Sequence, residues 1–264
     1  MRNSHVRKEK VLAGVAAKSE KPAESRVDTD PNVSSKAEYG MSAVEIAKRY
    51  ALFVVSLFIS ALGVAVTQKA ELGVSPISSV ANVMSIRLNF LTLGNWLIIW
   101  NLVLIAGQIV ILRKKFQLIQ LLQIPLSFLF GYFTDFWLWV IGSPELNGYL
   151  TRLAMVFVGT AVLALGVSLS VLANVIMNSG EAFVKALSDT TGPRFGNLKI
   201  AFDVVCVLSA VGLSLAFFDL SIVGTREGTV IAALTTGFFV NILPRLISKP
   251  VNMLIETKPA GHIS

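Results

Sequence analysis

Charge, cysteine and histidine are all scarce in this chain of 264 residues. Only 15% of the residues are charged and 54% are hydrophobic, whereas a soluble domain carries about 25% charged residues. The single cysteine, Cys206, excludes an intrachain disulfide and a cysteine-based metal site. The two histidines, His5 and His262, lie near the two ends of the chain, which argues against a histidine-based centre. These shortages exclude a soluble enzyme and a disulfide-stapled secreted domain.

Catalytic signatures are absent as well. The sequence has no H-E-x-x-H zinc motif, no G-x-S-x-G nucleophile motif and no phosphate-binding P-loop. We therefore expect no enzymatic activity, no metal and no cofactor. The basic residues flank apolar stretches and form no basic face interleaved with aromatic residues, so we also expect no nucleic-acid partner.

Apolar stretches are what the chain has in abundance. Six of them run for roughly 19–25 residues, enough to cross a hydrocarbon core of about 30 Å as helices. They occupy residues 50–68, 92–112, 116–140, 152–177, 198–218 and 228–247. This pattern predicts an all-α, polytopic membrane protein whose partner is the lipid bilayer, with a transmembrane domain over residues 49–247. The polar residues 1–48 are expected to be a disordered cytosolic tail, and 248–264 a short cytosolic C-terminal tail.

The positions of lysine and arginine predict the orientation of these spans. With the N-terminus inside, 19 of the 23 basic residues fall in cytosolic segments. The outer segments keep Lys69, Arg87, Arg152 and Arg226. Because basic residues concentrate on the cytoplasmic side, both termini are predicted to be cytoplasmic.

The sequence also repeats itself. An offset of 103 residues superimposes Ala61–Val64 on Ala164–Val167 and matches Arg49 with Arg152. At an offset of 102, Gly94 and Asn95 meet Gly196 and Asn197, and Asn101 meets Asp203; at 106, Gly131 meets Gly237 and Asp135 meets Asn241. Each copy, 49–140 and 152–247, contains three spans. Since three is an odd number, the two copies are predicted to be inverted relative to one another, as in many secondary transporters.

A short helix is expected after the first span of each copy. Ser75 is a good N-cap with Pro76 at the first helical position, and Ser78, Ser79 and Asn82 follow. In the second copy Asn178 or Ser179 caps a segment whose first turn holds Glu181. These segments are either two half-helices that enter the membrane from opposite sides or two amphipathic helices at its surfaces. Their polar residues favour the surface interpretation.

Polar residues inside the spans are the other candidates for a site. Asp203 and its repeat mate Asn101 could bind a solute or cation, or could tie helices together. Glu227 stands at the start of the last span, from which it could reach the interior. Asp135 is expected at a solvated helix end. Gln117, Gln120 and Gln123 share one face of the third predicted span, and Pro125 should kink that helix. Gly63 and Gly166 are expected to be close-packing points between helices. The predicted substrate-binding residues are Ser75, Ser78, Ser79, Asn82, Asn101, Ser179, Glu181, Asp203 and Glu227.

Three segments resemble the YczE/YyaS/YitT group of bacterial membrane proteins, most closely its YczE branch. They are Ala61–Val64, Gly73–Ser79 and Gly224–Ile231, within a resemblance that covers about residues 49–247. The resemblance implies a protein of the bacterial cytoplasmic (inner) membrane and supplies no catalytic residues.

Two functions are therefore expected. The first is a secondary transporter or permease for a small polar solute or ion, with a polar site where the repeats meet. The alternative is a non-transporting membrane scaffold or regulator, in which the polar pairs only pack helices and the tail recruits partners. The sequence identifies no substrate and leaves a homo-oligomer open.

Overall fold

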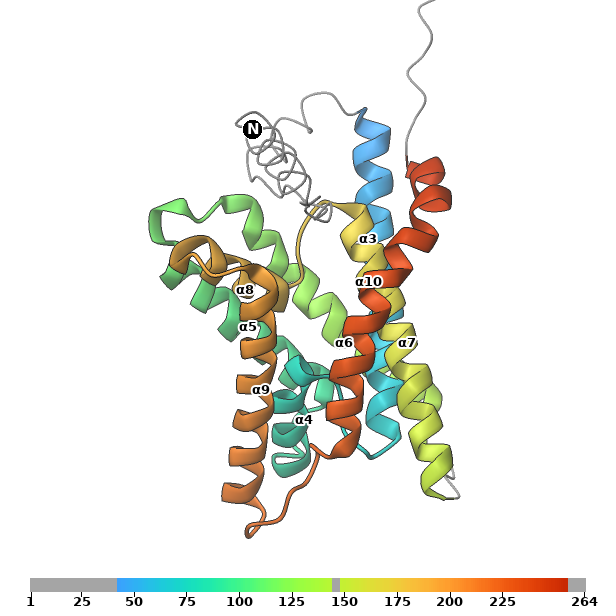
Figure 1. The fold of residues 1–264 in the computed structure, drawn as a ribbon, viewed down its shortest axis with the longest axis vertical. Helices are drawn as coiled ribbons and strands as arrows, with labels where there is room; N and C mark the ends of the chain where they lie inside the picture. Colours follow the sequence, from blue (N-terminus) through green and yellow to red (C-terminus); the bar gives the residue numbers. More distant parts are fainter. Residues whose placement is uncertain (1–41, 144–147, 256–264) are drawn as a thin grey trace, which may run out of the picture. The chain divides into compact units, whose positions relative to one another are not determined.

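The computed structural model describes residues 42–143 and 148–255, and in this part of the chain the regular structure is helical, without a strand. In chain order the α-helices are α3 (Ala43–Lys69), α4 (Pro76–Arg87), α5 (Leu93–Leu112), α6 (Gln123–Ile141), α7 (Tyr149–Ala173), α8 (Ser179–Thr191), α9 (Phe195–Phe217) and α10 (Glu227–Ile255) (Figure 1). Two 3₁₀ segments, Arg113–Lys115 and Leu118–Leu122, join α5 to α6. Most of the predicted N-terminal tail and the end of the predicted C-terminal tail lie outside the described residues.

Within the described ranges, five helical segments are long and apolar enough to cross a membrane, and the bent helix α10 makes a sixth if its two arms count as one span. This confirms the prediction of a polytopic helical membrane protein. Helix α3 begins well before the predicted span because Ser42 caps it, accepting a hydrogen bond from the amide of Val44. Residues 43–48 are therefore part of the first span's helix and not of a tail, and α10 likewise runs on to Ile255.

Proline determines where the third and sixth spans depart from a straight helix. Pro125 falls in the first turn of α6, where a missing amide costs no helical hydrogen bond. The chain before α6 is 3₁₀-helical, so Pro125 does not kink a continuous α-helix as the sequence suggested. In α10, Pro244 removes an amide donor and crowds the carbonyl of residue 240. The two arms of α10, Glu227–Val240 and Ile242–Ile255, meet there at 45°.

The first helices of the two predicted repeats, α3 and α7, cross closely. A Cβ added to Gly63 would lie 2.4 Å from the amide nitrogen of Leu163 and 2.7 Å from the carbonyl oxygen of Gly159. A Cβ added to Gly166 would lie 2.6 Å from the amide nitrogen of Ser60 and 2.8 Å from the carbonyl oxygen of Ser56. The close-packing role predicted for both glycines is thus confirmed.

The remaining long helices pack within their own half, whereas the two short helices pack across the halves. Helix α6 packs on α3, and α10 packs on α7. Short helix α4 lies against α9, whereas short helix α8 lies against α5. Each short helix therefore packs on the long helix of the opposite half.

Candidate functional site

The first turns of the two short helices meet inside the bundle. A Cβ added to Gly180, the second residue of α8, would lie 2.8 Å from Cδ1 of Ile77, the second residue of α4. The residues before the two helices, Ser75 and Asn178, have the same backbone conformation, with φ −57° and ψ 150°. Both residues occupy the predicted N-cap position, but neither side chain accepts a hydrogen bond from a backbone amide of its helix. We call this meeting point, residues 75–79 and 178–181, the short-helix junction.

Four buried polar side chains surround the start of α8. The amides of Gln108 on α5 and Gln123 on α6 form a reciprocal pair, with N···O distances of 3.1 and 3.2 Å. Gln108 also donates to the carbonyl oxygen of Ser179 at 3.1 Å. The hydroxyls of Ser127 and Ser179 lie 3.3 Å apart. This network joins α5, α6 and the first residue of α8.

Serine and asparagine side chains line α4. The hydroxyl of Ser75 donates to that of Ser78 at 3.0 Å. Ser79 is fully buried and donates to the carbonyl oxygen of Pro76 at 2.6 Å, with the carbonyl oxygen of Cys206 on α9 at 3.4 Å. One turn further on, Asn82 donates to the carbonyl oxygen of Gly224 at 2.7 Å. Helix α4 is buried on several sides, which departs from the surface interpretation favoured by its composition.

The segments before α4 and α10 pack against one another. Gly73 has a φ of +115°, and a Cβ added to it would lie 2.2 Å from the hydroxyl oxygen of Thr229, so glycine is required there on both counts. Within the described part of the chain, three buried oxygen atoms near this contact have no hydrogen-bond partner: Asn82 Oδ1, Thr225 Oγ1 and Thr229 Oγ1. Each costs about 1–3 kcal/mol while unpaired.

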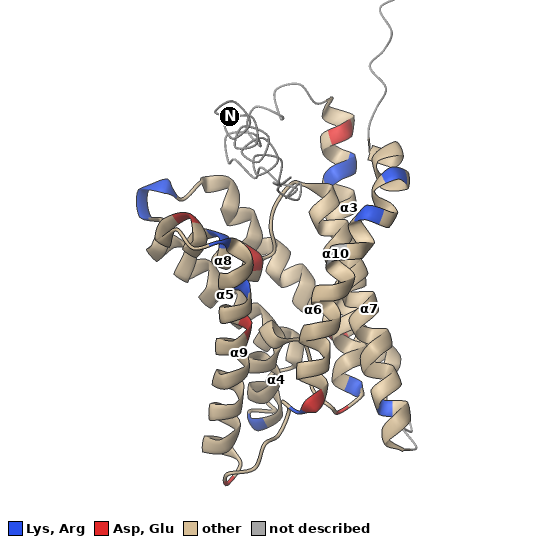
Figure 2. Cartoon of the chain, viewed as in Figure 1, with Lys and Arg blue, Asp and Glu red and all other residues tan. Residues whose placement is uncertain are grey.

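A charged cluster lies where α8 meets α9. Lys199 donates to both carboxylate oxygens of Asp203, at 2.5 and 2.7 Å, one turn along the same helix. Glu181 lies close enough to interact electrostatically with both. Burial raises the pKa of the Glu181 carboxyl above its ordinary value, and the Lys199 ammonium opposes that rise. Figure 2 shows that most of the length of α3, α6, α7 and α10 carries no charge, in contrast to this region.

Two of the predicted site residues lie apart from the junction. Asn101 is half-buried on α5. Glu227 begins α10, but its carboxylate is exposed and lies 3.4 Å from the guanidinium of its neighbour Arg226. The structure therefore assembles Ser75, Ser78, Ser79, Ser179 and Glu181 at the junction, with Asn82 and Asp203 on the adjoining turns.

Asp135, in the last turns of α6, holds the start of α5. Its carboxylate accepts from the Thr92 hydroxyl at 2.6 Å and from the Gly94 amide at 2.9 Å. Thr92 in turn caps α5, accepting from the amide of Asn95. A Cβ added to Gly94 would lie 2.2 Å from the carbonyl oxygen of Gly131. Helices α5 and α6 are thus fastened together at this end.

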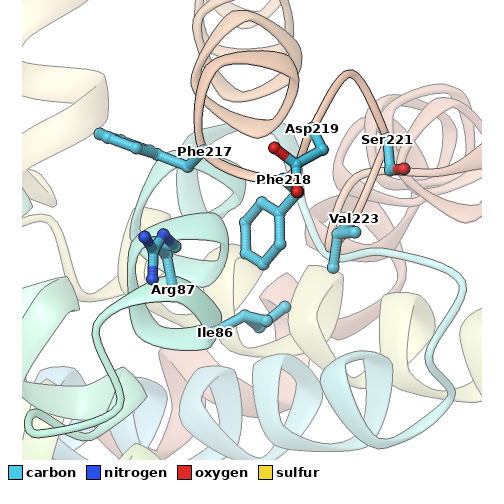
Figure 3. Close-up of a pocket in the computed structure, with 7 residues that line it drawn as sticks. All are labelled: Ile86, Arg87, Phe217, Phe218, Asp219, Ser221 and Val223. Atoms are coloured by element: carbon cyan, nitrogen blue, oxygen red, sulfur yellow. The ribbon is translucent and has the colours of Figure 1, made fainter.

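A shallow hollow of about 500 Å³ lies away from the junction, between the end of α4 and the turn after α9 (Figure 3). Its lining includes Arg87, Phe218 and Asp219, and it shares no residue with the predicted site.

Several site residues were missed from the sequence. Gln108 is a lone glutamine in an apolar stretch, and its partner Gln123 lies across a loop, so no local pattern links them. The pairing of Lys199 with Asp203 could have been predicted, because a lysine four residues before an aspartate lies on the same helix face.

The helices and their buried polar contacts define this chain as a multi-pass membrane protein. It belongs to a family of unknown function, DUF6198, which matches residues 47–245. The chain is also similar to the uncharacterized protein YyaS of Bacillus subtilis (strain 168), with 27% identity over 122 residues, which are 46% of this chain and 59% of YyaS. The match thus spans less than two thirds of that relative. No solved structure matches. The YyaS-type resemblance is confirmed, whereas assignment to the YczE branch stays a prediction.

Proposed function

We propose that this protein is a secondary transporter or permease for a small polar solute, with its binding region at the short-helix junction. We further propose that it consists of two inverted repeats in the bacterial cytoplasmic membrane, with both termini cytoplasmic. The observation that carries the proposal is the contact between Ile77 and Gly180, which brings the first turns of α4 and α8 together inside the bundle. Discontinuous helices that begin near the midplane at a repeat interface are typical binding elements of secondary transporters.

Reciprocal contacts support the repeat. Gly63 packs on Leu163 and Gly159, and Gly166 packs on Ser60 and Ser56. Because an offset of 103 residues turns the first set into the second, the same surface patch is used twice, as in an isologous interface.

The ends of α3 and α7 repeat this relation. Arg49 at the start of α3 donates to the carbonyl oxygen of Ala173 at the end of α7. Its mate Arg152 forms an ion pair with Glu71, just after α3. Glu71 and Asn174, also 103 residues apart, both adopt positive φ, at 60° and 49°. Non-glycine residues are uncommon there, so the coincidence supports a common fold for the two halves.

Polar chemistry at the junction supports binding of a small polar solute. The side chains there are chiefly hydroxyls and amides, with Glu181 as the nearest carboxylate, and α4 and α8 direct their first-turn amides towards the same region. The first-turn amides of a helix have no partner within the helix, so a polar solute could accept hydrogen bonds from them.

Ligand binding and transport test this proposal in sequence. The purified full-length chain is screened by melting temperature against amino acids, sugars, nucleosides and small carboxylates. A ligand at 100 times its Kd should stabilise the fold by about 2.7 kcal/mol. Radiolabelled forms of any stabilising solute are then followed into proteoliposomes.

Matched variants locate the site. Ser78→Ala and Glu181→Gln alter the junction, whereas Ser209→Ala changes an exposed serine on α9 and serves as the control. We expect uptake to fall by about two- to twelvefold in the junction variants, since a lost hydrogen bond to a solute costs about 0.5–1.5 kcal/mol, and to stay unchanged in the control. Asp203→Asn tests the charged cluster separately: unchanged uptake would remove Asp203 from the mechanism. If no solute stabilises or enters, or if all variants transport like wild type, the proposal is wrong.

A further inference from the structure

One packing contact breaks the correspondence between the two halves. Helices α5 and α6 pack closely, with Gly94 against Gly131 and Asp135. Their counterparts are α9 and α10, in which the repeat places Gly196 and Gly237 at the same positions. Over the described residues, α9 and α10 form no comparable packing. Figure 1 shows α10 leaning away from α9 towards its C-terminal end.

Helix α9 has a glycine, Gly196, at the position where the close packing of α5 requires Gly94. A Cβ added to Gly94 would lie 2.2 Å from a backbone oxygen, so α5 and α6 approach closely only because position 94 is glycine. A Cβ added to Gly196 would meet nothing within 4 Å. Packing in the present structure therefore does not require glycine at position 196, the second residue of α9.

The two contacts also lie at opposite ends of the bundle. Gly94 begins α5 and Gly196 begins α9, and the sequence predicts the first end to face outwards and the second to face the cytoplasm. Closure at one end together with separation at the other is the arrangement expected of one state in alternating access.

Building on the transporter function proposed above, we propose that the first turn of α9, at Gly196, is an unassigned docking surface for α10. In a second conformation α9 closes on α10 as α5 now closes on α6, while the contact of Gly94 with Gly131 opens. The structure is then the conformation that is open at the predicted cytoplasmic end.

Distances between spin labels test the two conformations directly. In a Cys206→Ala background, one nitroxide pair replaces Ile200 on α9 and Leu246 on α10, which are 66% and 68% exposed. A second pair replaces Ile99 on α5 and Val140 on α6, which are 39% and 49% exposed. Double electron–electron resonance on the full-length protein in nanodiscs should give two distances for each spin-label pair. The short distance should be the minor population for the α9–α10 pair and the major population for the α5–α6 pair.

Two glycine substitutions should shift these populations in opposite directions. Gly94→Ala obstructs the closed α5–α6 contact, so the short α9–α10 component should rise about tenfold relative to the long one. Gly196→Leu fits the present structure but obstructs the second conformation, so the short α9–α10 component should disappear. Gly212→Leu is the control, because a Cβ there also meets nothing within 4 Å on the same helix.

The outcomes separate this inference from the transport function. A single long α9–α10 distance in wild type and Gly94→Ala alike would overturn the second conformation. Equal effects of Gly196→Leu and Gly212→Leu would overturn the role of Gly196. Two distances that respond as expected, in a protein that transports no solute, would support the conformations and reject the transporter.

Discussion

The crossing of α3 and α7 offers the sharpest test of the fold, through Gly63→Ala. Cβ atoms essentially never lie within 3.0 Å of another atom, yet the added Cβ would lie 2.4 Å from the amide nitrogen of Leu163. The obstructing atoms belong to backbone and cannot rotate away, so the cost should lie near the upper end of overpacking, about 3 kcal/mol. The better helix propensity of alanine returns about 1 kcal/mol. We expect a net destabilisation of about 2 kcal/mol.

The control is Gly212→Ala on α9. It gains the same propensity, and its Cβ meets nothing within 4 Å. The two substitutions should therefore differ by about 3 kcal/mol, and since propensity cancels, the difference measures the crossing alone. At about 2–4 °C per kcal/mol for a domain of this size, the melting temperatures of the detergent-solubilised proteins should differ by about 6–12 °C.

Gly166→Ala completes the experiment. Because the contacts of Gly166 are the repeat mates of those of Gly63, the two substitutions should cost the same within about 0.5 kcal/mol. One separation of α3 from α7 relieves both, so the double variant should cost less than the sum. Equal melting temperatures for Gly63→Ala and Gly212→Ala, or strict additivity at the crossing, would refute the reasoning.

Three further changes test the contacts around the short-helix junction and the contact between α5 and α6. Gln108→Ala leaves the amide of Gln123 unpaired and should cost about 1–3 kcal/mol by melting temperature, while Gln108→Leu with Gln123→Leu should recover most of it; no recovery would contradict the amide pair. Asp135→Ala removes the acceptor for the Gly94 amide and should cost roughly 1.5–3 kcal/mol, whereas an unchanged melting temperature would mean that solvent replaces it. Glu181→Gln is tested by following stability against pH. The folded state binds the Glu181 proton more tightly than the unfolded state, so wild type should lose stability relative to the variant as pH rises above about 4.3. A stability difference that does not change with pH would contradict the raised pKa of Glu181.

Hydropathy and helix-start chemistry predicted the helices well because both are local properties. An apolar run long enough to span a bilayer has few other structures open to it, and Pro76 after Ser75 predicted the first residue of α4. The start of α3 was missed because the polar residues 43–48 resemble a tail by composition. They are helical because Ser42 caps them and Glu45 pairs with Arg49 across one turn.

Burial was harder to predict than helicity. The serines and Asn82 of α4 suggested a helix exposed to water, but Ser79 and Asn82 donate to backbone oxygens inside the protein. A serine that bonds to the preceding turn needs no solvent, so polar composition does not distinguish a buried short helix from a surface one. The bend in α10 was not predicted, although Pro244 is a local signal for it in the sequence.

The hydrogen bonds of Asp135 explain why the start of α5 is held firmly against α6. Asp135 accepts from the Gly94 amide and the Thr92 hydroxyl, so a full negative charge stabilises the start of α5. Its repeat mate is Asn241, a neutral amide, and charge-assisted hydrogen bonds are roughly twice as strong as neutral ones. In the second conformation proposed above, the α9–α10 contact should therefore be weaker than the present α5–α6 contact. A transporter needs such a difference to be small, because a solute moves the equilibrium only by its differential affinity for the two states.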